Sequence, residues 1–254
     1  MQNKLYATTR RLTAQKPACF DLPDENGNLT LLKTPDSTQK IAEGGLRLQG
    51  FYKTGSKEDP LITVITVVFN GADYLEDTIK SVIEQKFDNV EYIIIDGGST
   101  DATLEIIRRY EHAIDYWVSE PDSGMYDALR KGFLTASGDL MGYLNAGDIY
   151  TNTTLQSVVD FFKDTGKKWF TGMRSVCNEL NFVTSVDLPF RYKSNLIRQG
   201  IYGRNLPYIQ QESTFWHRNM LSCVDMDTFG GLRLAGDYYL WFCFSQHESL
   251  ARFF

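Results

Sequence analysis

From Pro60 onward, short apolar runs alternate with amphipathic segments, and no other feature of the chain constrains its fold as strongly. The runs are continuous and rich in Val and Ile, as strands buried on both faces of a sheet are. The expected strands span residues 61–69, 90–96, 114–120, 140–144 and 168–173. The expected helices span residues 74–85, 99–110, 125–136 and 154–166. Strands and helices that alternate with short links predict an α/β fold with a mostly parallel sheet flanked by helices.

The residues before this region have no sustained periodicity. Residues 1–58 are therefore expected to form an irregular N-terminal arm, with a short hairpin near Asn26-Gly27. The apolar residues Leu46, Leu48 and Phe51 are expected to order the end of the arm against the core.

The rest of the chain, residues 59–254, is expected to form a single domain with two halves. The alternation holds over 59–173 and fails over 174–254, which predicts a smaller mixed C-terminal half. Within it, residues 181–190 are expected to form an extended strand, and a helix is expected to begin at Asp237.

Composition excludes several classes of protein. The net charge of −6 and a pI of about 5.2 disfavour a broad nucleic-acid-binding surface. The four cysteines form no CxxC pair and the three histidines are far apart, so reduced thiols in the cytoplasm fit better than zinc or disulfides. The longest apolar run, 61–69, is too short for a membrane span, and the first fifteen residues lack the apolar core of a secretory signal.

Small and polar residues follow the expected strands. Parallel sheets bind ligands beyond the carboxyl ends of their strands, so these positions are where a site is expected. The strand ends lie at residues 69–70, 96–99, 120–124 and 145–148. Three of the four contain an Asp, which favours a cation or phosphate site at this edge over simple helix capping.

Three common nucleotide or hydrolase motifs are absent from the sequence. No GxGxxG follows the first strand, which disfavours a dinucleotide-binding protein. GxxxxGK[ST] and GxSxG are also absent, which disfavours a P-loop enzyme and an α/β-hydrolase.

Five motifs, in their order and spacing, resemble the family 2 glycosyltransferases of the GT-A fold. They are "ITVVFNGADYLEDTIKSVIEQ", "EYIIIDGGSTDATLEII", "EPDSGMYDALRKGFLTASGDLMGYLNAGD", "QQESTFW" and "RLAGDYYLW". The resemblance is strong over residues 60–160 and is closest to bacterial members that build capsule, O-antigen or exopolysaccharide. The resemblance implies a GT-A nucleotide-diphospho-sugar transferase fold with a Rossmann-like sheet. It also implies that the half over residues 59–173 binds the nucleotide-sugar and that the half over residues 174–254 forms the acceptor side.

The resemblance implies inverting transfer of a hexosyl-type sugar from a nucleotide-diphosphate sugar to a hydroxyl acceptor, either a saccharide or a lipid-linked saccharide. On the donor side, Phe69 would pack on the base or, alternatively, in the core. Asp96 would contact the nucleotide or cap a helix, while the family's second acid is replaced by Gly97, so the base is not identified. The remaining donor-side residues implied are Asn70, Asp122, Ser123, Asp127, Lys131 and Asn145. Asp127 and Lys131 lie four residues apart and would alternatively pair with each other.

The turn "YLNAGD" occupies the place of the family's metal-binding Asp-x-Asp. Asn145 and Gly147 replace two acids, and Asp148 is retained. Mg²⁺ uses few protein carboxylates and keeps waters and substrate phosphates as ligands, so we expect a reduced Mn²⁺ or Mg²⁺ site at Asp148. The alternative is a turn with no metal ion.

On the acceptor side, Asp237 matches the family's catalytic base. An Asp is normally ionised at neutral pH and can accept the proton of the acceptor hydroxyl; Asp237 would alternatively be the N-cap of its helix. The resemblance places Gln211 and Glu212 at the donor or acceptor, and Trp216 either under a sugar ring or in the core.

Two other functions fit parts of the sequence. A nucleotidyltransferase is weakened by the lack of a Gly-rich basic loop after the first strand, and a degenerate sugar-binding relative is weakened by the retention of Asp148 and Asp237 together. A lipid-linked acceptor would bring the protein to the inner face of the cytoplasmic membrane, although no basic amphipathic helix is evident.

Overall fold

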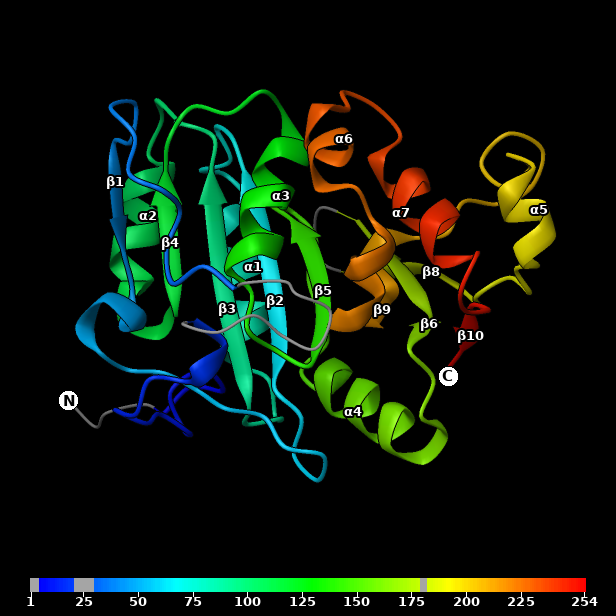
Figure 1. Ribbon diagram of the computed structural model, residues 1–254, viewed down its shortest axis with the longest axis horizontal. Helices are drawn as coiled ribbons and strands as arrows, with labels where there is room; N and C mark the ends of the chain where they lie inside the picture. Colours follow the sequence, from blue (N-terminus) through cyan, green and yellow to red (C-terminus); the bar gives the residue numbers. More distant parts are fainter. Residues whose placement is uncertain (1–4, 21–29, 179–181) are drawn as a thin grey trace.

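The computed structural model describes residues 5–20, 30–178 and 182–254, so the hairpin expected near Asn26-Gly27 lies outside the described residues. Its main feature is an eight-stranded sheet with the order β1-β4-β3-β2-β5-β9-β6-β10 (Figure 1). The strands are β1 (Ala42–Gly44), β2 (Ile62–Val68), β3 (Val90–Asp96), β4 (Tyr116–Ser119), β5 (Leu140–Asn145), β6 (Trp169–Thr171), β9 (Thr214–His217) and β10 (Ala251–Arg252).

The centre of the sheet is parallel, as expected. Strands β3 and β5 flank β2, with Ile62 of β2 opposite Val90 and Leu140, and β4 extends the parallel set beyond β3. All seven residues of β2 and of β3 are buried, which explains why apolar residues predominate in both strands.

Helices cover both faces of the sheet (Figure 1). They are α1 (Leu75–Ile83), α2 (Thr103–Tyr110), α3 (Met125–Thr135), α4 (Thr154–Thr165), α5 (Ser194–Arg198), α6 (Met226–Gly231) and α7 (Gly236–Phe244). Side chains of α1, α2 and α4 join one core cluster, and those of α3, α6 and α7 join the other. Alternate residues of β2 enter the two clusters, Ile65 and Val67 one and Ile62 and Val64 the other, so the sheet separates two hydrophobic layers.

The right-hand part of the sheet is mixed (Figure 1). Strand β9, which comes late in the chain, inserts between β5 and β6 and is antiparallel to both. The fifth expected strand is therefore present as β6, but it does not neighbour the parallel set. The GT-A expectation of a mostly parallel sheet with a smaller mixed half is confirmed by the comparisons reported below.

The N-terminal arm is bound to the sheet through charged residues. Strand β1 pairs antiparallel with β4 at the sheet edge. Leu46 is buried, as expected, but Leu48 and Phe51 are exposed, so the expectation that they order the arm is wrong. Arg47 and Lys53 are buried instead, each with a carboxylate partner.

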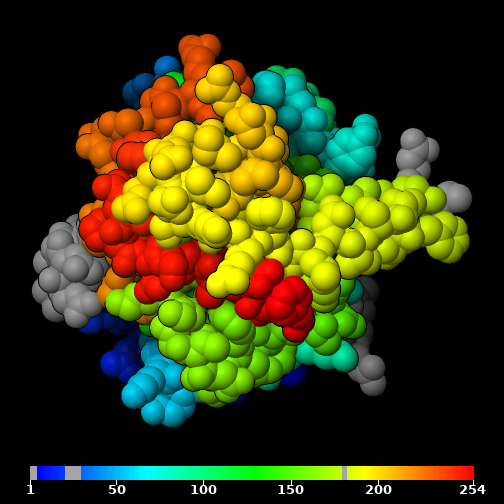
Figure 2. All heavy atoms as spheres, turned by 90° about the vertical axis from the view of Figure 1, so that its right-hand side faces the viewer, coloured from blue at the N-terminus to red at the C-terminus, as the bar shows by residue number. Residues whose placement is uncertain are grey.

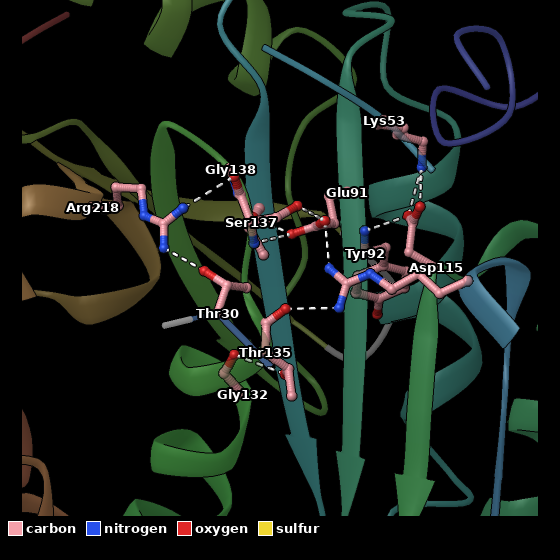
Figure 3. Close-up of polar contacts among 12 residues, drawn as sticks. Thr30, Lys53, Glu91, Tyr92, Asp115, Gly132, Thr135, Ser137, Gly138 and Arg218 are labelled. Atoms are coloured by element: carbon pink, nitrogen blue, oxygen red, sulfur yellow. Dashed lines mark hydrogen bonds and ion pairs between the residues drawn. The ribbon is translucent and has the colours of Figure 1, made fainter. Parts of the chain in front are cut away.

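These two buried ion pairs lie near the amino ends of the strands. Arg47 pairs with Glu91 and donates to the Thr135 carbonyl at 2.7 Å, and Lys53 Nζ lies 2.5 Å from Asp115. Figure 3 shows Asp115 also accepting from the Tyr92 backbone N–H, and Ser137 donating to Glu91. A buried charge is tolerated when it is paired and hydrogen-bonded, and each of these groups meets that condition.

A second, two-stranded sheet is formed by β7 (Arg174–Cys177) and β8 (Val183–Asp187). Strand β8 lies within the range 181–190 where an extended strand was expected, whereas β7 was not predicted. This hairpin projects from the body of the molecule (Figure 2, right). Among the residues that the structure describes, none of the helices combines the length and apolar character needed to span a membrane.

Candidate active site

A large cleft lies beyond the carboxyl end of β5 and has a volume of about 1080 Å³. Its walls come from distant parts of the chain: the start of α1, the turn after β5, strand β7, residues 208–212 and the start of α7. The cleft brings together three acids that are far apart in sequence, Asp148, Glu212 and Asp237. Convergence of carboxylates in a large cleft marks a candidate active site.

Asp237 lies in the first turn of α7, as expected, but it is not the N-cap. The N-cap position is Ala235, which adopts a left-handed conformation with φ of 60°. A Cβ on Gly236 would lie 2.4 Å from the ring of Tyr126, so this position fits only a glycine without rearrangement. The strained turn and the close packing fix the direction of the Asp237 side chain.

Two tyrosine hydroxyls hold the Asp237 carboxyl. Tyr143 of β5 donates a hydrogen bond to Oδ1, and the Tyr126 hydroxyl also interacts with the carboxylate. Burial raises the pKa of Asp237, and the two hydroxyls lower it in part because they stabilise the charged form. The result is an oriented carboxylate with a raised pKa, which suits a general base.

Asp148 lies in the turn after β5, next to Gly147, whose φ is 109°. The Gln211 side chain donates to Asp148 Oδ2 at 3.1 Å, and the Asp148 backbone N–H donates to the Asn145 carbonyl at 3.0 Å. Burial raises the pKa of Asp148. Asp148 and Gln211 thus contact each other, and their roles at a metal ion and a substrate stay predictions.

The polar atoms around Asp148 suit a hard cation. The side-chain oxygens of Asn145 and Gln211 are buried and have no hydrogen-bond partner in the described part of the chain. Unpaired buried carbonyl oxygens are costly, and they are ligands that Mg²⁺ and Mn²⁺ accept. No cluster of three or more His, Cys, Asp or Glu that could hold a metal occurs among the described residues, so an ion here would depend on Asp148, amide oxygens and substrate phosphates.

Arg174 contributes the positive charge of the cleft and was not predicted from the sequence. Its Nε lies 3.7 Å from Glu212 Oε1 and 3.8 Å from Asp187 Oδ2. Burial raises the pKa of Glu212, and the charges of Asp148 and Asp237 raise it further, whereas Arg174 lowers it. Among the described residues that line the cleft, Arg174 is the one cation facing these acids.

A second hollow of about 300 Å³ lies on the other side of Asp237. Its lining is largely aromatic, with Tyr202, Tyr238 and Trp241, and includes Arg204. Tyr208, Ile209 and Asp237 line both the cleft and this hollow. Asp237 is therefore shared by the linings of both spaces.

A comparison with known families identifies the chain. The sequence profile described as glycosyl transferase family 2 matches residues 63–225, which is more than half of the 254 residues. The chain belongs to glycosyl transferase family 2.

Curated relatives of this glycosyltransferase match over a shorter region. An uncharacterized glycosyltransferase of Mycobacterium tuberculosis is 43% identical over 93 residues, which are 36% of each chain. TuaG of Bacillus subtilis, named for a proposed role in teichuronic acid biosynthesis, is 34% identical over 117 residues, 44% of this chain and 46% of TuaG. The matches thus span about a third to a half of the length of these relatives.

Solved structures confirm the GT-A fold. S. aureus TarS 1–349 aligns with a TM-score of 0.60 at 15% identity, covering 76% of this chain and 58% of TarS. Glucosyl-3-phosphoglycerate synthase of Mycobacterium tuberculosis, solved with Mn²⁺, UDP and product, aligns with a TM-score of 0.51 at 16% identity, covering 77% of this chain and 70% of that one.

Part of the predicted donor side of the glycosyltransferase lies outside the large cleft. Asp122, Ser123, Asp127 and Lys131 line a separate hollow of about 380 Å³. Lys131 Nζ lies 2.9 Å from Glu120 Oε1 and 3.8 Å from Asp127 Oδ2, so it is already paired with acids. Asp127 accepts from the Ser123 backbone N–H at 3.2 Å. The alternative that Asp127 and Lys131 pair with each other is therefore present in the structure. A role for Lys131 at a diphosphate stays a prediction.

The ends of β2 and β3 hold the other donor-side residues. Phe69 is 64% exposed, so the alternative of core packing is wrong. Asn70 has a φ of 50°, and its side-chain oxygen accepts from the Thr100 backbone N–H at 2.9 Å. Asp96 is fully buried and accepts from Ser99 and Ser119, so its carboxylate holds the loop.

Trp216 does not face a ligand. Its side chain is fully buried, with the ring 5.9 Å from that of Trp241 and 5.8 Å from that of Phe244. The prediction that it supports a sugar ring is wrong, and the alternative of a core position holds. Gln211 and Glu212, two of the three acceptor-side residues, do line the cleft.

The tyrosines around Asp237 were missed in the sequence, although one had a signal. Tyr143 lies inside the apolar run 140–144, and a buried tyrosine hydroxyl usually requires a partner. Arg174 had no signal, because a single arginine in a short exposed strand is common.

Proposed function

We propose that this glycosyltransferase is inverting and moves a hexosyl-type sugar from a nucleotide-diphosphate sugar to a hydroxyl acceptor in cell-surface polysaccharide synthesis. The observation that carries the proposal is that Asp237 lines both the large cleft and the aromatic hollow. A base for a two-substrate reaction must contact the acceptor while facing the donor. This position meets both requirements.

In the proposed reaction the donor binds in the large cleft and the acceptor enters from the aromatic hollow. Asp237 removes the proton of the acceptor hydroxyl as its oxygen attacks the anomeric carbon. The bond from that carbon to the diphosphate oxygen breaks, and its electron pair leaves with the diphosphate. Attack from the face opposite the leaving group inverts the configuration. Tyr143 and Tyr126 hold the carboxylate in its orientation throughout.

The leaving diphosphate needs positive charge. Arg174 is positioned to supply part of it because its guanidinium lies in the same cleft. Asp148, with the amide oxygens of Asn145 and Gln211, would hold Mn²⁺ or Mg²⁺, which would supply electrostatic stabilisation of the departing phosphates. Phe69 would stack on the nucleobase because its ring is exposed at the end of β2.

A UDP-sugar is the first donor class to test. TarS was solved with UDP and with UDP-GlcNAc, and the synthase of Mycobacterium tuberculosis with UDP and Mn²⁺. The name of TuaG supports a bacterial polysaccharide as the product. The proposed acceptor is a saccharide or lipid-linked saccharide at the cytoplasmic face of the membrane.

The test measures nucleotide binding and turnover separately. Thermal shifts with UDP, GDP, dTDP and CMP, each with and without Mn²⁺, should give a metal-dependent rise with one nucleotide, since a ligand specific to the folded state stabilises it. Turnover of the matching nucleotide-sugar should release nucleoside diphosphate.

Asp237→Asn should lower turnover by about a thousandfold while keeping the thermal shift, because general bases contribute about 10² to 10⁴. Asp227→Asn, whose side chain is 99% exposed, is the matched control. A shift without turnover of any sugar would instead support a binding protein. Release of pyrophosphate from a nucleoside triphosphate and sugar phosphate would support a nucleotidyltransferase.

A further inference from the structure

The segment 188–208 is basic in an otherwise acidic protein. It contains Arg191, Lys193, Arg198 and Arg204 and no acidic residue, whereas the whole chain has a net charge of −6. All four side chains are exposed, and in the described part of the chain none forms an ion pair. The segment therefore presents uncompensated positive charge to solvent.

Exposed apolar side chains adjoin these cations. Every residue of β8 is exposed, and Phe182, Val183, Val186 and Leu188 are each more than half exposed. The acid of this stretch, Asp187, lies 3.8 Å from Arg174. Figure 2 shows the projecting β7–β8 hairpin and the following segment, in yellow, on the same face of the molecule. We call residues 182–208 the basic face.

The basic face borders the aromatic hollow. Gly200, Tyr202, Arg204 and Tyr208 belong to the face and line the hollow together with Asp237. A surface bound by the basic face would consequently lie beside the opening through which the proposed acceptor reaches the base.

We propose that the basic face docks the protein on an anionic membrane surface. Anionic headgroups attract exposed cations, and the apolar side chains of the projecting hairpin can enter the headgroup region. A second copy of the chain fits less well, because a twofold contact would set the cations of one copy against the same cations of the other. The docking itself does not depend on the proposed function. Its consequence, that the acceptor is lipid-linked, rests on that function.

The primary test is co-sedimentation with lipid vesicles. The wild-type protein should bind vesicles of phosphatidylcholine with phosphatidylglycerol, should not bind phosphatidylcholine alone, and should be released as salt is raised. The variant Arg191→Gln/Lys193→Gln/Arg198→Gln should bind about a hundredfold more weakly, because each cation near an anionic surface contributes about fivefold.

A matched variant distinguishes the effect of where the charges lie from the effect of the protein's net charge on vesicle binding. Lys57→Gln/Lys86→Gln/Lys163→Gln removes the same charge from exposed positions outside the basic face and should bind vesicles like the wild type. Phe182→Ser/Leu188→Ser should weaken binding to anionic vesicles at low salt without lowering Tm, since both side chains are 67% exposed.

Three outcomes would overturn the proposal: equal loss in both charge variants, equal binding to neutral vesicles, or self-association of the wild type that the basic-face variant abolishes. The nucleotide-induced thermal shift, measured in the same variants, should be unchanged. Failure of the wild-type protein to bind anionic vesicles while its donor turnover is intact would contradict the membrane inference alone. Vesicle binding by a wild-type protein that turns over no donor would contradict the proposed function alone.

Discussion

At Asp237, burial and two hydroxyl groups act on the pKa in opposite directions. Burial raises it, while Tyr143 and Tyr126 lower it in part by stabilising the carboxylate. Since a general base must be ionised, the acid limb of kcat/KM should lie above the ordinary Asp value of about 3.9.

Tyr143→Phe should move that acid limb to higher pH, because the carboxylate loses a hydrogen bond that favours its charged form. The measurement is the pH profile of kcat/KM. Tyr150→Phe is the control, since the Tyr150 hydroxyl is also buried but has no partner among the described residues. An unchanged profile in Tyr143→Phe would show that Asp237 is not the group that titrates.

Arg174 is expected to act on the donor rather than on the base. Arg174→Gln removes the cation of the cleft and should weaken nucleoside diphosphate binding by about tenfold to a hundredfold, the range for hydrogen bonds to charged groups. Calorimetric titration of the diphosphate measures this. Arg109→Gln is the control, because the partner of Arg109 is Glu76 on the surface, and it should bind the diphosphate like the wild type. If Arg174→Gln also binds the diphosphate like the wild type, Arg174 is not part of the donor site.

At the scale of elements, the start of α7 depends on a glycine. In Gly236→Ala the added Cβ would lie 2.4 Å from Tyr126, so the helix or the ring must move. Overpacking costs about 1–3 kcal/mol, and the displacement should also lower turnover because Asp237 follows directly. In Gly231→Ala, in α6, the added Cβ meets no atom within 4 Å. This variant should keep the wild-type turnover, and its stability should be unchanged or slightly higher. Chemical denaturation and turnover test both variants.

The elements themselves were largely predictable where the pattern is local. The strand over 90–96 has the predicted bounds because its residues are buried on both faces and Tyr92 to Ile95 form a local apolar run. The insertion of β9 between β5 and β6 was not predictable, since it depends on pairing between distant segments. Asp148 and Asp237 followed from motifs, whereas Arg174 reaches the cleft through the same long-range packing.

At the scale of the whole molecule, buried charges attach the N-terminal arm to the sheet. Lys53 is fully buried against Asp115, which precedes β4. Burial lowers the pKa of Lys53 and raises that of Asp115, and each partner's charge opposes the effect on the other. The sequence did not reveal this pairing, because Lys53 and Asp115 are far apart in the chain and charged residues are seldom fully buried unless they are paired.

Lys53→Met should destabilise the fold by about 3–5 kcal/mol, because Asp115 becomes an unpaired buried charge. Lys53→Met/Asp115→Asn should recover much of this loss, since the Asn oxygen can still accept from the Tyr92 N–H. Urea unfolding measures both. If the double variant is no more stable than the single one, the loss comes from packing of the lysine stem rather than from the stranded carboxylate.

The loss in Lys53→Met should also depend on pH. Without the lysine, burial and the nearby charge of Glu91 raise the folded-state pKa of Asp115 further above its unfolded value, opposed only in part by the hydrogen bond from the Tyr92 N–H. The folded state then binds a proton that the unfolded state has released, so stability falls as pH rises through this interval. The variant should therefore be closer to the wild type at pH 5 than at pH 7. A loss that is the same at both values would mean that Asp115 stays charged with water as its partner, and that the arm does not depend on the buried pair.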